Sequence, residues 1–282
     1  MNANSNFLSS ITEAKRAEMA KVSAAERATI RAAALAKRAG HSHHAFREAL
    51  AHGGRINIIA EVKRSSPSAG AICRDADPVR FASLYSAHGA AAISVLTEPV
   101  YFSGSLSDLR AVCTAVKCPA LRKDFIVDSH QIFEAAAAGA EAVLLIVAAL
   151  APAEILTLRA LVEDELGMDA LVEVHAELEM QAAIDCGARM IGVNNRNLAT
   201  LAVDLATSRA LARYAQPGRV LVSESGLRTA DDLRELAALG YNAFLIGERL
   251  MRAPDPARAL EELIAQSSMQ VQSAEVGEIG RG

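Results

Sequence analysis

The sequence has no tryptophan, few cysteines and no long uncharged segment. Its four cysteines form no CxxC pair, so neither a zinc site nor an iron–sulfur cluster is predicted, and we expect reduced thiols. Lysine and arginine number 29 against 33 aspartate and glutamate residues, which leaves no basic excess to neutralise a phosphate backbone. Nucleic acid is therefore not expected as a partner.

Membrane and export signals are also missing. The longest uncharged apolar run covers residues 142–153, whereas a helix needs about 20 residues to cross a bilayer. Charged side chains interrupt residues 1–20, where a secretory signal would have an uncharged core. We therefore expect a cytoplasmic protein with no membrane partner, acting as a monomer, with a weak dimer as the alternative.

A repeat organises most of the chain. Four times a helical stretch ends at a glycine and a short apolar run follows; these glycines are Gly89, Gly139, Gly187 and Gly240. A glycine that takes the left-handed conformation ends a helix, and the apolar run behind it is typical of a buried strand. Four further apolar runs alternate with these, at residues 56–62, 119–124, 170–175 and 219–223.

Both sets together predict eight strands, ending near residues 62, 96, 124, 147, 174, 194, 223 and 246. Every gap between them has room for a crossover helix. Strand and helix alternating eight times predict an α/β fold of the (β/α)8 TIM barrel type. The alternative is a doubly wound open sheet, but that fold would need a glycine-rich turn after its first strand, where the sequence reads Lys63–Pro67.

Two segments lie outside the predicted barrel of residues 55–266. Residues 1–54 read as an N-terminal helical extension, in which Ser23 and Glu26 have the spacing of a capping box. We expect this extension to pack over one end of the barrel. Residues 267–282 are rich in small and polar residues, and we expect a disordered tail there.

Polar side chains stand where the predicted strands end. All βα loops of such a barrel open on one face, so residues at the carboxyl ends of the strands line its active site. A charged side chain at the end of a buried strand is unfavourable unless it is paired, hydrated or used. Six of the eight strands end in this way, which favours a functional mouth; the residues include Glu61, Lys63, Lys123, Glu173, Asn194 and Arg196.

Strand alternation sharpens the prediction. Residues two apart share a face of a strand, so Glu61 and Lys63 point the same way, as do Asn194 and Arg196. Lysines and carboxylates meeting in one cavity suit an anionic substrate that undergoes proton transfer. The alternative is that they form ordinary salt bridges or lie on the rim. Two converging lysines should also lower each other's pKa, an effect that the carboxylates and the substrate's phosphate would offset. If Lys123 is an acid that titrates between roughly pH 7 and 10, the pH–rate profile should show a basic limb in that range.

The last two loops carry small residues. Ser225 and Gly226 follow the seventh strand, and Gly247 follows the eighth, at the places where many barrels bind phosphate through backbone amides. An ordinary tight turn is the alternative. Glu248 is an unfavourable neighbour for a phosphate, so we assign binding to the amides and not to its side chain.

No cofactor or metal is predicted. His41, His43 and His44 cluster in the extension, but no further ligand accompanies them, so a solvated loop is expected. The motifs of zinc proteases, serine hydrolases and P-loop enzymes are missing. The residues alone therefore indicate metal-independent acid–base chemistry on a phosphorylated small molecule.

The strand-end motifs, in order, resemble those of indole-3-glycerol phosphate synthase over about residues 7–265. They are Ile59–Ser68, Ile93–Glu98, Leu121–Phe125, Leu171–His175, Gly192–Leu198 and Ser223–Gly226. The resemblance implies a carboxy-lyase of tryptophan biosynthesis. Its reaction closes the ring of 1-(2-carboxyphenylamino)-1-deoxyribulose 5-phosphate, with loss of carbon dioxide and water, to give indole-3-glycerol phosphate.

The resemblance also implies roles for residues. Lys123 would be the general acid at the ribulose carbonyl and Glu173 the base. Glu61 would be a second catalytic carboxylate, and Lys63 would contact the substrate and protonate the departing hydroxyl. The implied substrate-binding residues are Ser66, Asn194, Arg196, Phe102, Phe125 and Leu144, and the implied phosphate-binding residues are Ser225, Gly226 and Gly247. From the residues alone, the three apolar ones fit a core as well as a wall.

Two other functions stay open at this point. Phosphoribosylanthranilate isomerase is a related barrel that would share the phosphate loops but has no use for the pair Lys63 and Lys123. A barrel that binds a phosphorylated ligand without converting it is the other alternative.

Overall fold

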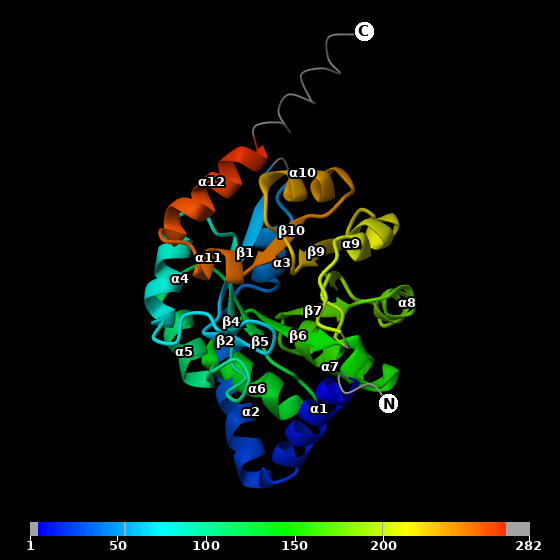
Figure 1. Cartoon of the computed structure of the whole chain (residues 1–282). Coiled ribbons are helices and arrows are strands. Elements are labelled where there is room, and N and C mark those ends of the chain that lie inside the picture. Colours follow the sequence, from blue (N-terminus) through cyan, green and yellow to red (C-terminus); the bar gives the residue numbers. More distant parts are fainter. Residues whose placement is uncertain (1–4, 54, 199, 269–282) are drawn as a thin grey trace.

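The structure is a computed structural model, and it describes residues 5–53, 55–198 and 200–268. Parallel strands form a closed barrel at its centre, and helices surround them (Figure 1). In chain order the barrel strands are β1 (Asn57–Val62), β4 (Ala92–Leu96), β5 (Ala120–Lys123), β6 (Ala142–Ile146), β7 (Asp169–Val174), β8 (Met190–Asn194), β9 (Val220–Glu224) and β10 (Ala243–Ile246). The predicted TIM barrel is confirmed.

A helix follows each strand before the next strand begins. These helices are α4 (Pro78–Ala87), α5 (Leu106–Ala115), α6 (Ser129–Ala138), α7 (Pro152–Ala160), α8 (Glu177–Asp185), α9 (Ala206–Leu211), α10 (Ala230–Ala238), the short α11 (Glu248–Met251) and α12 (Pro256–Ser268). Their beginnings follow from the sequence. At α4, for example, the Asp77 carboxylate accepts hydrogen bonds from Val79 N and Arg80 N, and proline takes the first helical position.

The repeated glycines end helices as expected. Gly139 has φ 94° and caps α6, and the other three glycines of the repeat also have positive φ values. Only glycine takes this conformation without steric strain, so each helix stops there and the chain enters the sheet. This explains why the repeat was visible in the sequence.

The barrel has two hydrophobic layers. Alternate residues of each strand face the helices, as Ile58 and Ala60 do, and contribute to the outer layer. The others fill the interior, where Ile59, Leu121 and Val222 pack together. Phe46 and Leu50, both fully buried, join this interior cluster from outside the sheet.

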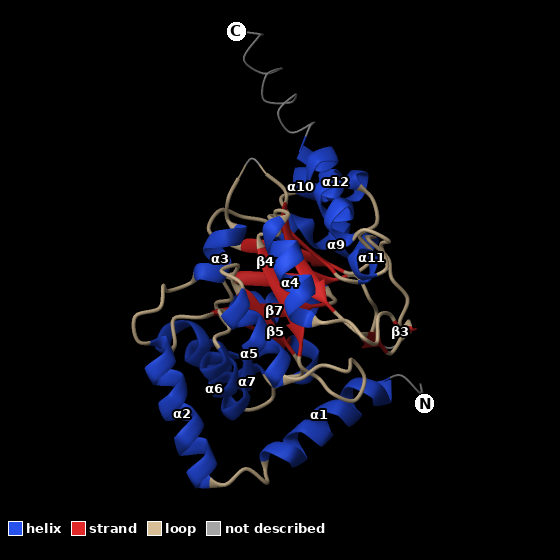
Figure 2. Ribbon diagram, turned by 90° about the vertical axis from the view of Figure 1, so that its left-hand side faces the viewer, coloured by secondary structure: helices blue, strands red, loops and turns tan. Residues whose placement is uncertain are grey.

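Phe46 and Leu50 belong to the N-terminal extension, which consists of α1 (Ser5–Met19), α2 (Ala24–Arg38) and α3 (Ala45–Leu50). The predicted capping box at Ser23 begins α2. Only α3 closes an end of the barrel; α2 packs along α6 on its outside, and α1 runs back toward the mouth (Figure 2). The extension therefore wraps from one end of the barrel to the other, which differs from the expected packing over one end.

Ion pairs fasten the extension to the barrel. Arg38 Nη1 lies 2.7 Å from Glu141 Oε2, and His41 Nδ1 lies 3.0 Å from the other oxygen of the same carboxylate. His44 Nδ1 lies 3.2 Å from Asp169 Oδ1, at the start of β7. The expectation of a solvated histidine loop is thus wrong for His41 and His44, because both contact acidic residues of the barrel that are distant in sequence.

The remaining features concern the loops and the C-terminus. The loop after β1 forms a small hairpin, β2 (Ser65–Ser66) and β3 (Gly70–Ala71), which the sequence did not suggest. The last helix includes Ser267 and Ser268, while the rest of the predicted tail, 269–282, lies outside the described residues. Within the described part of the chain, no helix is long and apolar enough to cross a membrane.

Candidate active site

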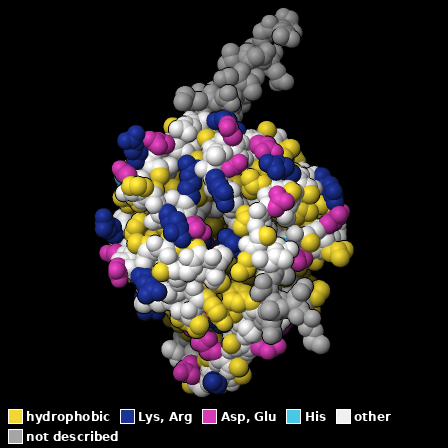
Figure 3. Space-filling view, in the orientation of Figure 1, with side chains coloured by type: hydrophobic (Ala, Val, Ile, Leu, Met, Phe, Trp, Pro, Cys, Tyr) yellow, Lys and Arg dark blue, Asp and Glu magenta, His cyan; other side chains and the backbone are white. Residues whose placement is uncertain are grey.

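A cavity of about 390 Å³ opens at the carboxyl ends of the strands. Figure 3 shows the face of the molecule seen in Figure 1, with lysine and arginine side chains around a hollow near its middle. Every residue that the sequence analysis proposed for the site lines this cavity: Glu61, Lys63, Ser66, Phe102, Lys123, Phe125, Leu144, Glu173, Asn194, Arg196, Ser225, Gly226 and Gly247. The barrel therefore brings together residues from all parts of its sequence.

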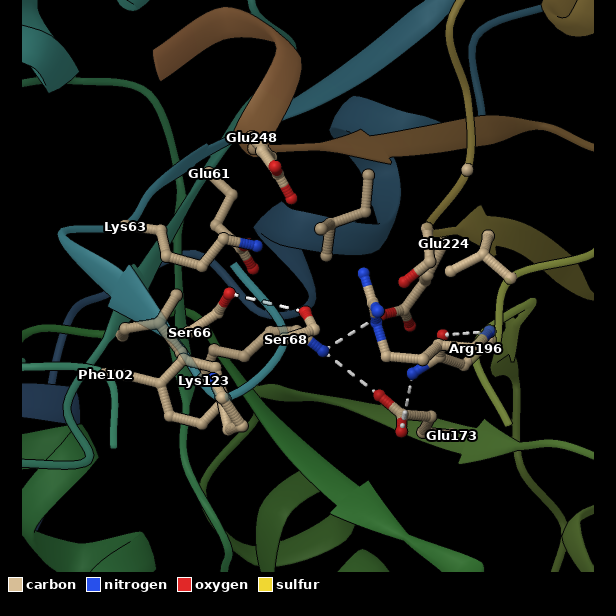
Figure 4. A pocket seen from close by; sticks show the side chains of 18 of the residues that line it. Glu61, Lys63, Ser66, Ser68, Phe102, Lys123, Glu173, Arg196, Glu224 and Glu248 are labelled. Carbon is tan, nitrogen blue, oxygen red and sulfur yellow. Dashed lines mark hydrogen bonds and ion pairs between the residues drawn. The ribbon is translucent and has the colours of Figure 1, made fainter. Parts of the chain in front are cut away.

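Lys123 lies at the centre of the charged groups (Figure 4). Its Nζ is 3.0 Å from Glu173 Oε2 and 2.8 Å from Glu224 Oε2, and it donates a hydrogen bond to each. Burial by itself lowers the pKa of Lys123, but the carboxylates of Glu173, Glu224 and Glu61 outweigh it and raise the pKa well above its usual range. The carboxylates that were expected to offset repulsion between the lysines therefore dominate the field at Lys123, and its pKa is raised and not lowered.

Glu224 is a charged residue of the cavity that was not among the proposed site residues. Its side chain points into the barrel because it continues the inward face of β9, after Val220 and Val222. That alternation was present in the sequence, where Glu224 stands in the motif Ser223–Gly226 at the end of the seventh strand, but no role was assigned to it. Burial raises the pKa of Glu224 to about 7, with repulsion from Glu173 adding to it and Lys123 opposing it.

Small residues make room for two of the carboxylates. A Cβ atom on Gly192 would lie 2.2 Å from Glu224 Oε1, and one on Gly247 would lie 2.6 Å from Glu61 Oε1. Gly192 lies on β8, which pairs with β9, and Gly247 directly follows β10, which pairs with β1. A side chain at either position would therefore displace the carboxylate of the neighbouring strand. Gly247 thus leaves space for the Glu61 carboxylate, in addition to its place in the last loop.

Glu173 accepts donors at both of its oxygens. Lys123 approaches Oε2, while Asn194 Nδ2 donates to Oε1 at 3.2 Å and His175 Nε2 lies 3.3 Å from the same atom. Burial raises the pKa of Glu173, but Lys123, His175 and Asn194 more than offset this and hold the pKa well below its usual range. Glu173 is therefore ionised at neutral pH.

Glu61 and Lys63 form a second pair at the end of β1, across the cavity from Glu173 in Figure 4. Lys63 Nζ lies 2.7 Å from Glu61 Oε1, and Ser94 Oγ donates to Oε2 at 3.4 Å. The shared face expected from their spacing is confirmed. The salt bridge that was the alternative interpretation is also present, so pairing and a place in the cavity occur together.

Apolar side chains cover one side of the cavity. The rings of Phe102 and Phe125 have their centroids 6.4 Å apart, and Leu144 lies nearby on β6. Phe7, from α1, also lines the cavity and packs edge-on against Tyr101, with centroids 4.9 Å apart. The extension therefore contributes directly to the cavity wall, which the sequence analysis did not anticipate.

The loop after β9 has an unusual backbone conformation at the edge of the cavity. Ser225 has φ 65° and Gly226 φ 80°, so two successive residues take the left-handed conformation at the edge of the cavity. Such turns direct backbone N–H groups toward one point. Glu248 lines this end too, but its Oε1 is paired with Arg252 Nε at 3.0 Å, which reduces its repulsion of an anion.

Ser66 and Arg196 lie in the loops at the rim. Ser66 Oγ accepts a hydrogen bond from Ala69 N at 3.2 Å, within the hairpin after β1. Arg196 Nη1 donates to the carbonyl of Leu201 at 3.0 Å, which fixes the guanidinium over the cavity. Among the described residues, no group of histidine, cysteine and acidic side chains has the arrangement of a metal site.

Solved structures share the fold. Thiamine phosphate pyrophosphorylase from Pyrococcus furiosus is 17% identical, with a TM-score of 0.57, and the alignment covers 77% of this chain and 97% of that one. KGPDC from Streptococcus mutans is 14% identical with a TM-score of 0.58, covering 77% and 99%. At such low identity these likenesses concern the barrel alone.

Sequence comparison is far more specific. A chain from Syntrophobacter fumaroxidans named indole-3-glycerol phosphate synthase is 46% identical over 92% of this chain and 97% of its own length. One of the same name from Chromobacterium violaceum is 44% identical over 94% and 100%. The sequence model of the family described as indole-3-glycerol phosphate synthase matches residues 8–263. The chain, with its charged barrel mouth, belongs to the indole-3-glycerol phosphate synthase family.

Proposed function

We propose that the cavity converts 1-(2-carboxyphenylamino)-1-deoxyribulose 5-phosphate into indole-3-glycerol phosphate, carbon dioxide and water, with Lys123 as the general acid. Family membership supports the reaction. The observation that carries the assignment of Lys123 is its position, with an ammonium held by Glu173 and Glu224 inside the cavity. A buried ammonium that stays protonated can deliver a proton to a carbonyl oxygen as that oxygen gains charge.

Ring closure is the first step. The ring carbon that bears the carboxylate attacks the ribulose carbonyl, and Lys123 protonates the carbonyl oxygen as the new C–C bond forms. Loss of carbon dioxide then returns the bonding electrons to the ring. The wall of Phe102, Phe125 and Leu144 is suited to hold the aromatic ring during these steps, since apolar contact fixes a flat ring and excludes water.

Dehydration completes the reaction. In our assignment Glu173 removes a proton from the new ring, while Lys63 protonates the hydroxyl that leaves as water. Glu61, 2.7 Å from Lys63, fixes the ammonium and restores its proton. As written, the trianionic substrate becomes a dianionic product and neutral carbon dioxide, so one proton is taken up from solvent in each turnover.

Binding is divided between the two ends of the cavity. The amides of Ser225, Gly226 and Gly247 are proposed to hold the phosphate, and Ser66 and Arg196 the substrate carboxylate. Asn194 contacts Glu173 and lies beside the reacting atoms. We also propose that the chain acts as a monomer, because all of these residues come from a single chain, with a weak dimer as the alternative that light scattering tests. Membership of a biosynthetic enzyme family supports a place in the cytoplasm.

Supplying substrates separately tests the function. We expect indole-3-glycerol phosphate to form from the carboxyphenylamino substrate, and no conversion of phosphoribosylanthranilate. Because the chain has no tryptophan, the indole fluorescence of the product can be followed against a low background. Conversion of phosphoribosylanthranilate instead would show an isomerase, and calorimetric binding of product without turnover would show a binding protein.

A further inference from the structure

A single ammonium stands between two carboxyl groups. Lys123 Nζ is within 3.0 Å of both Glu173 and Glu224, and the two glutamates are 2% and 1% exposed. Ionising both glutamates at such a buried position is unfavourable, because water cannot solvate the charges and the second negative charge repels the first. The surroundings must therefore decide which of the two is ionised and able to act as a base.

Those surroundings differ strongly. Glu173 Oε1 accepts a hydrogen bond from Asn194 Nδ2 at 3.2 Å, and His175 Nε2 lies 3.3 Å from it, within ion-pair distance but not aligned for a hydrogen bond. Glu224 Oε1, by contrast, is buried and has no hydrogen-bond partner in the part of the chain that the structure describes, and its neighbour Gly192 offers no side chain. The charged groups that act on Glu224 from other strands are Lys123 and the two acids Glu173 and Glu61.

His175 is itself fixed by α8. Its Nδ1 lies 3.1 Å from Glu179 Oε2, and the same oxygen accepts a hydrogen bond from its backbone N at 2.7 Å. The charged groups that act on the imidazole are the acids Glu173 and Glu179. Burial lowers the pKa of His175, but these two carboxylates raise it to about 10, so the imidazole is a cation at neutral pH.

We propose that His175, held by Glu179, is a positioning residue that makes Glu173, and not Glu224, the ionised partner of Lys123. The imidazolium adds a positive charge on the side of Glu173 opposite to Lys123, whereas Glu224 has the ammonium alone. The inference rests on the proposed function, in which Glu173 is the base. The lowered pKa of Glu173 and the raised pKa of Glu224 agree with it.

Carboxyl ¹³C NMR of the full chain tests this directly. Glu173→Gln and Glu224→Gln assign the two signals, and a pH titration follows each. In the wild type we expect Glu173 to stay ionised while Glu224 titrates near pH 7. His175→Gln keeps a nitrogen donor but removes the charge, and we expect it to raise the titration midpoint of Glu173 by about one unit or more.

Two further variants complete the experiment. Glu179→Gln should shift Glu173 in the same direction by a smaller amount, and it serves if His175→Gln does not fold. His130→Asn is the matched control, because His130 also pairs with a glutamate four residues on, Glu134 at 3.6 Å, but does not line the cavity. We expect His130→Asn to leave both midpoints unchanged.

The kinetic readout is the pH profile of kcat. As the pH is lowered, the kcat of His175→Gln should begin to fall at a higher pH than the kcat of the wild type. KM should change little, since the substrate contacts are kept. An unchanged Glu173 midpoint in both His175→Gln and Glu179→Gln would overturn the inference. Because the titration needs no turnover, it is independent of the substrate assay, whose failure would overturn the proposed function instead.

Discussion

The ammonium of Lys123, at the end of β5, lies 3.0 Å from Oε2 of Glu173, at the end of β7, although β6 separates their strands. The two side chains meet because both point inward and β6 ends in the apolar residues Leu144 and Ile146, which leave the space above them open. A charged pair thus forms beside an apolar wall. An exposed ion pair of this kind contributes little to stability, whereas in a buried cavity it fixes the position of both charged groups.

Glu224 is expected to control the pH dependence of ring closure. Below its pKa of about 7 it is neutral; above that pH it becomes a second carboxylate on Lys123 and makes the ammonium a weaker acid. The single-turnover rate should therefore fall as pH rises through about 7. Glu224→Gln, which is neutral at every pH, should remove this limb.

Lys123 itself should not titrate in that range, since its pKa is raised well above the usual value. This corrects the expectation of a basic limb from Lys123 between about pH 7 and 10. A limb of unchanged midpoint in Glu224→Gln would contradict the assignment to Glu224. Mass spectrometry and circular dichroism would show that the variant is intact.

Gly192→Ala should impair catalysis more than stability. The new Cβ would lie 2.2 Å from Glu224 Oε1. The Glu224 carboxylate is more easily displaced than the backbone of β8, which carries the new Cβ. We expect kcat to fall by about tenfold to a hundredfold, since a small misplacement at an active site is costly, with a modest loss in Tm. Gly53→Ala is the control because nothing lies within 4 Å of its Cβ. Wild-type kinetics in Gly192→Ala would refute the spatial argument.

Gly226→Ala should weaken binding of the phosphate. Its φ of 80° disfavours any side chain, and the Cβ would meet Val203 Cγ1 at 2.5 Å. We expect KM to rise by about tenfold, and inorganic phosphate to raise Tm less than in the wild type. Gly218→Ala has the same kind of strain, with φ 84° and open space, away from the cavity. Equal effects of the two variants on KM would show that Gly226 acts through strain alone.

Much of this site was predictable because the signal is periodic. The eight strand ends lie within one residue of the positions expected from the repeat, since glycine caps and buried strands are both local features. Alternation along β1 placed Glu61 and Lys63 on one face correctly. The same rule applied to Val220, Val222 and Glu224 would have found the missed carboxylate.

Other features depend on contacts between distant segments. Phe7 reaches the cavity because α1 runs back along the barrel, and its Lys15 pairs with Asp124 at 3.3 Å; neither contact has a local sequence signal. The balance of charges around Lys123 has no local sequence signal either, because only the distances show that the acids outweigh burial. Contacts and charge effects between distant segments can be found only from the three-dimensional arrangement.

Phe7→Ala should affect substrate binding in particular. The ring lines the cavity and packs on Tyr101, so its removal opens the wall without disturbing the barrel core. We expect KM to rise by about threefold to tenfold, the value of one lost aromatic contact, with kcat nearly unchanged. Leu35→Ala, at an exposed position of α2, is the control. An unchanged KM would place Phe7 outside the binding surface.

The most direct test of the account is the turnover of Lys123→Met, followed by indole fluorescence beside the wild type. Methionine keeps the length of the side chain but removes the acid, and one of the two glutamates can take up a proton in its place. We predict a folded protein by circular dichroism with kcat lower by about 10²- to 10⁴-fold. A folded Lys123→Met that forms indole-3-glycerol phosphate at the wild-type rate would contradict the central role of Lys123.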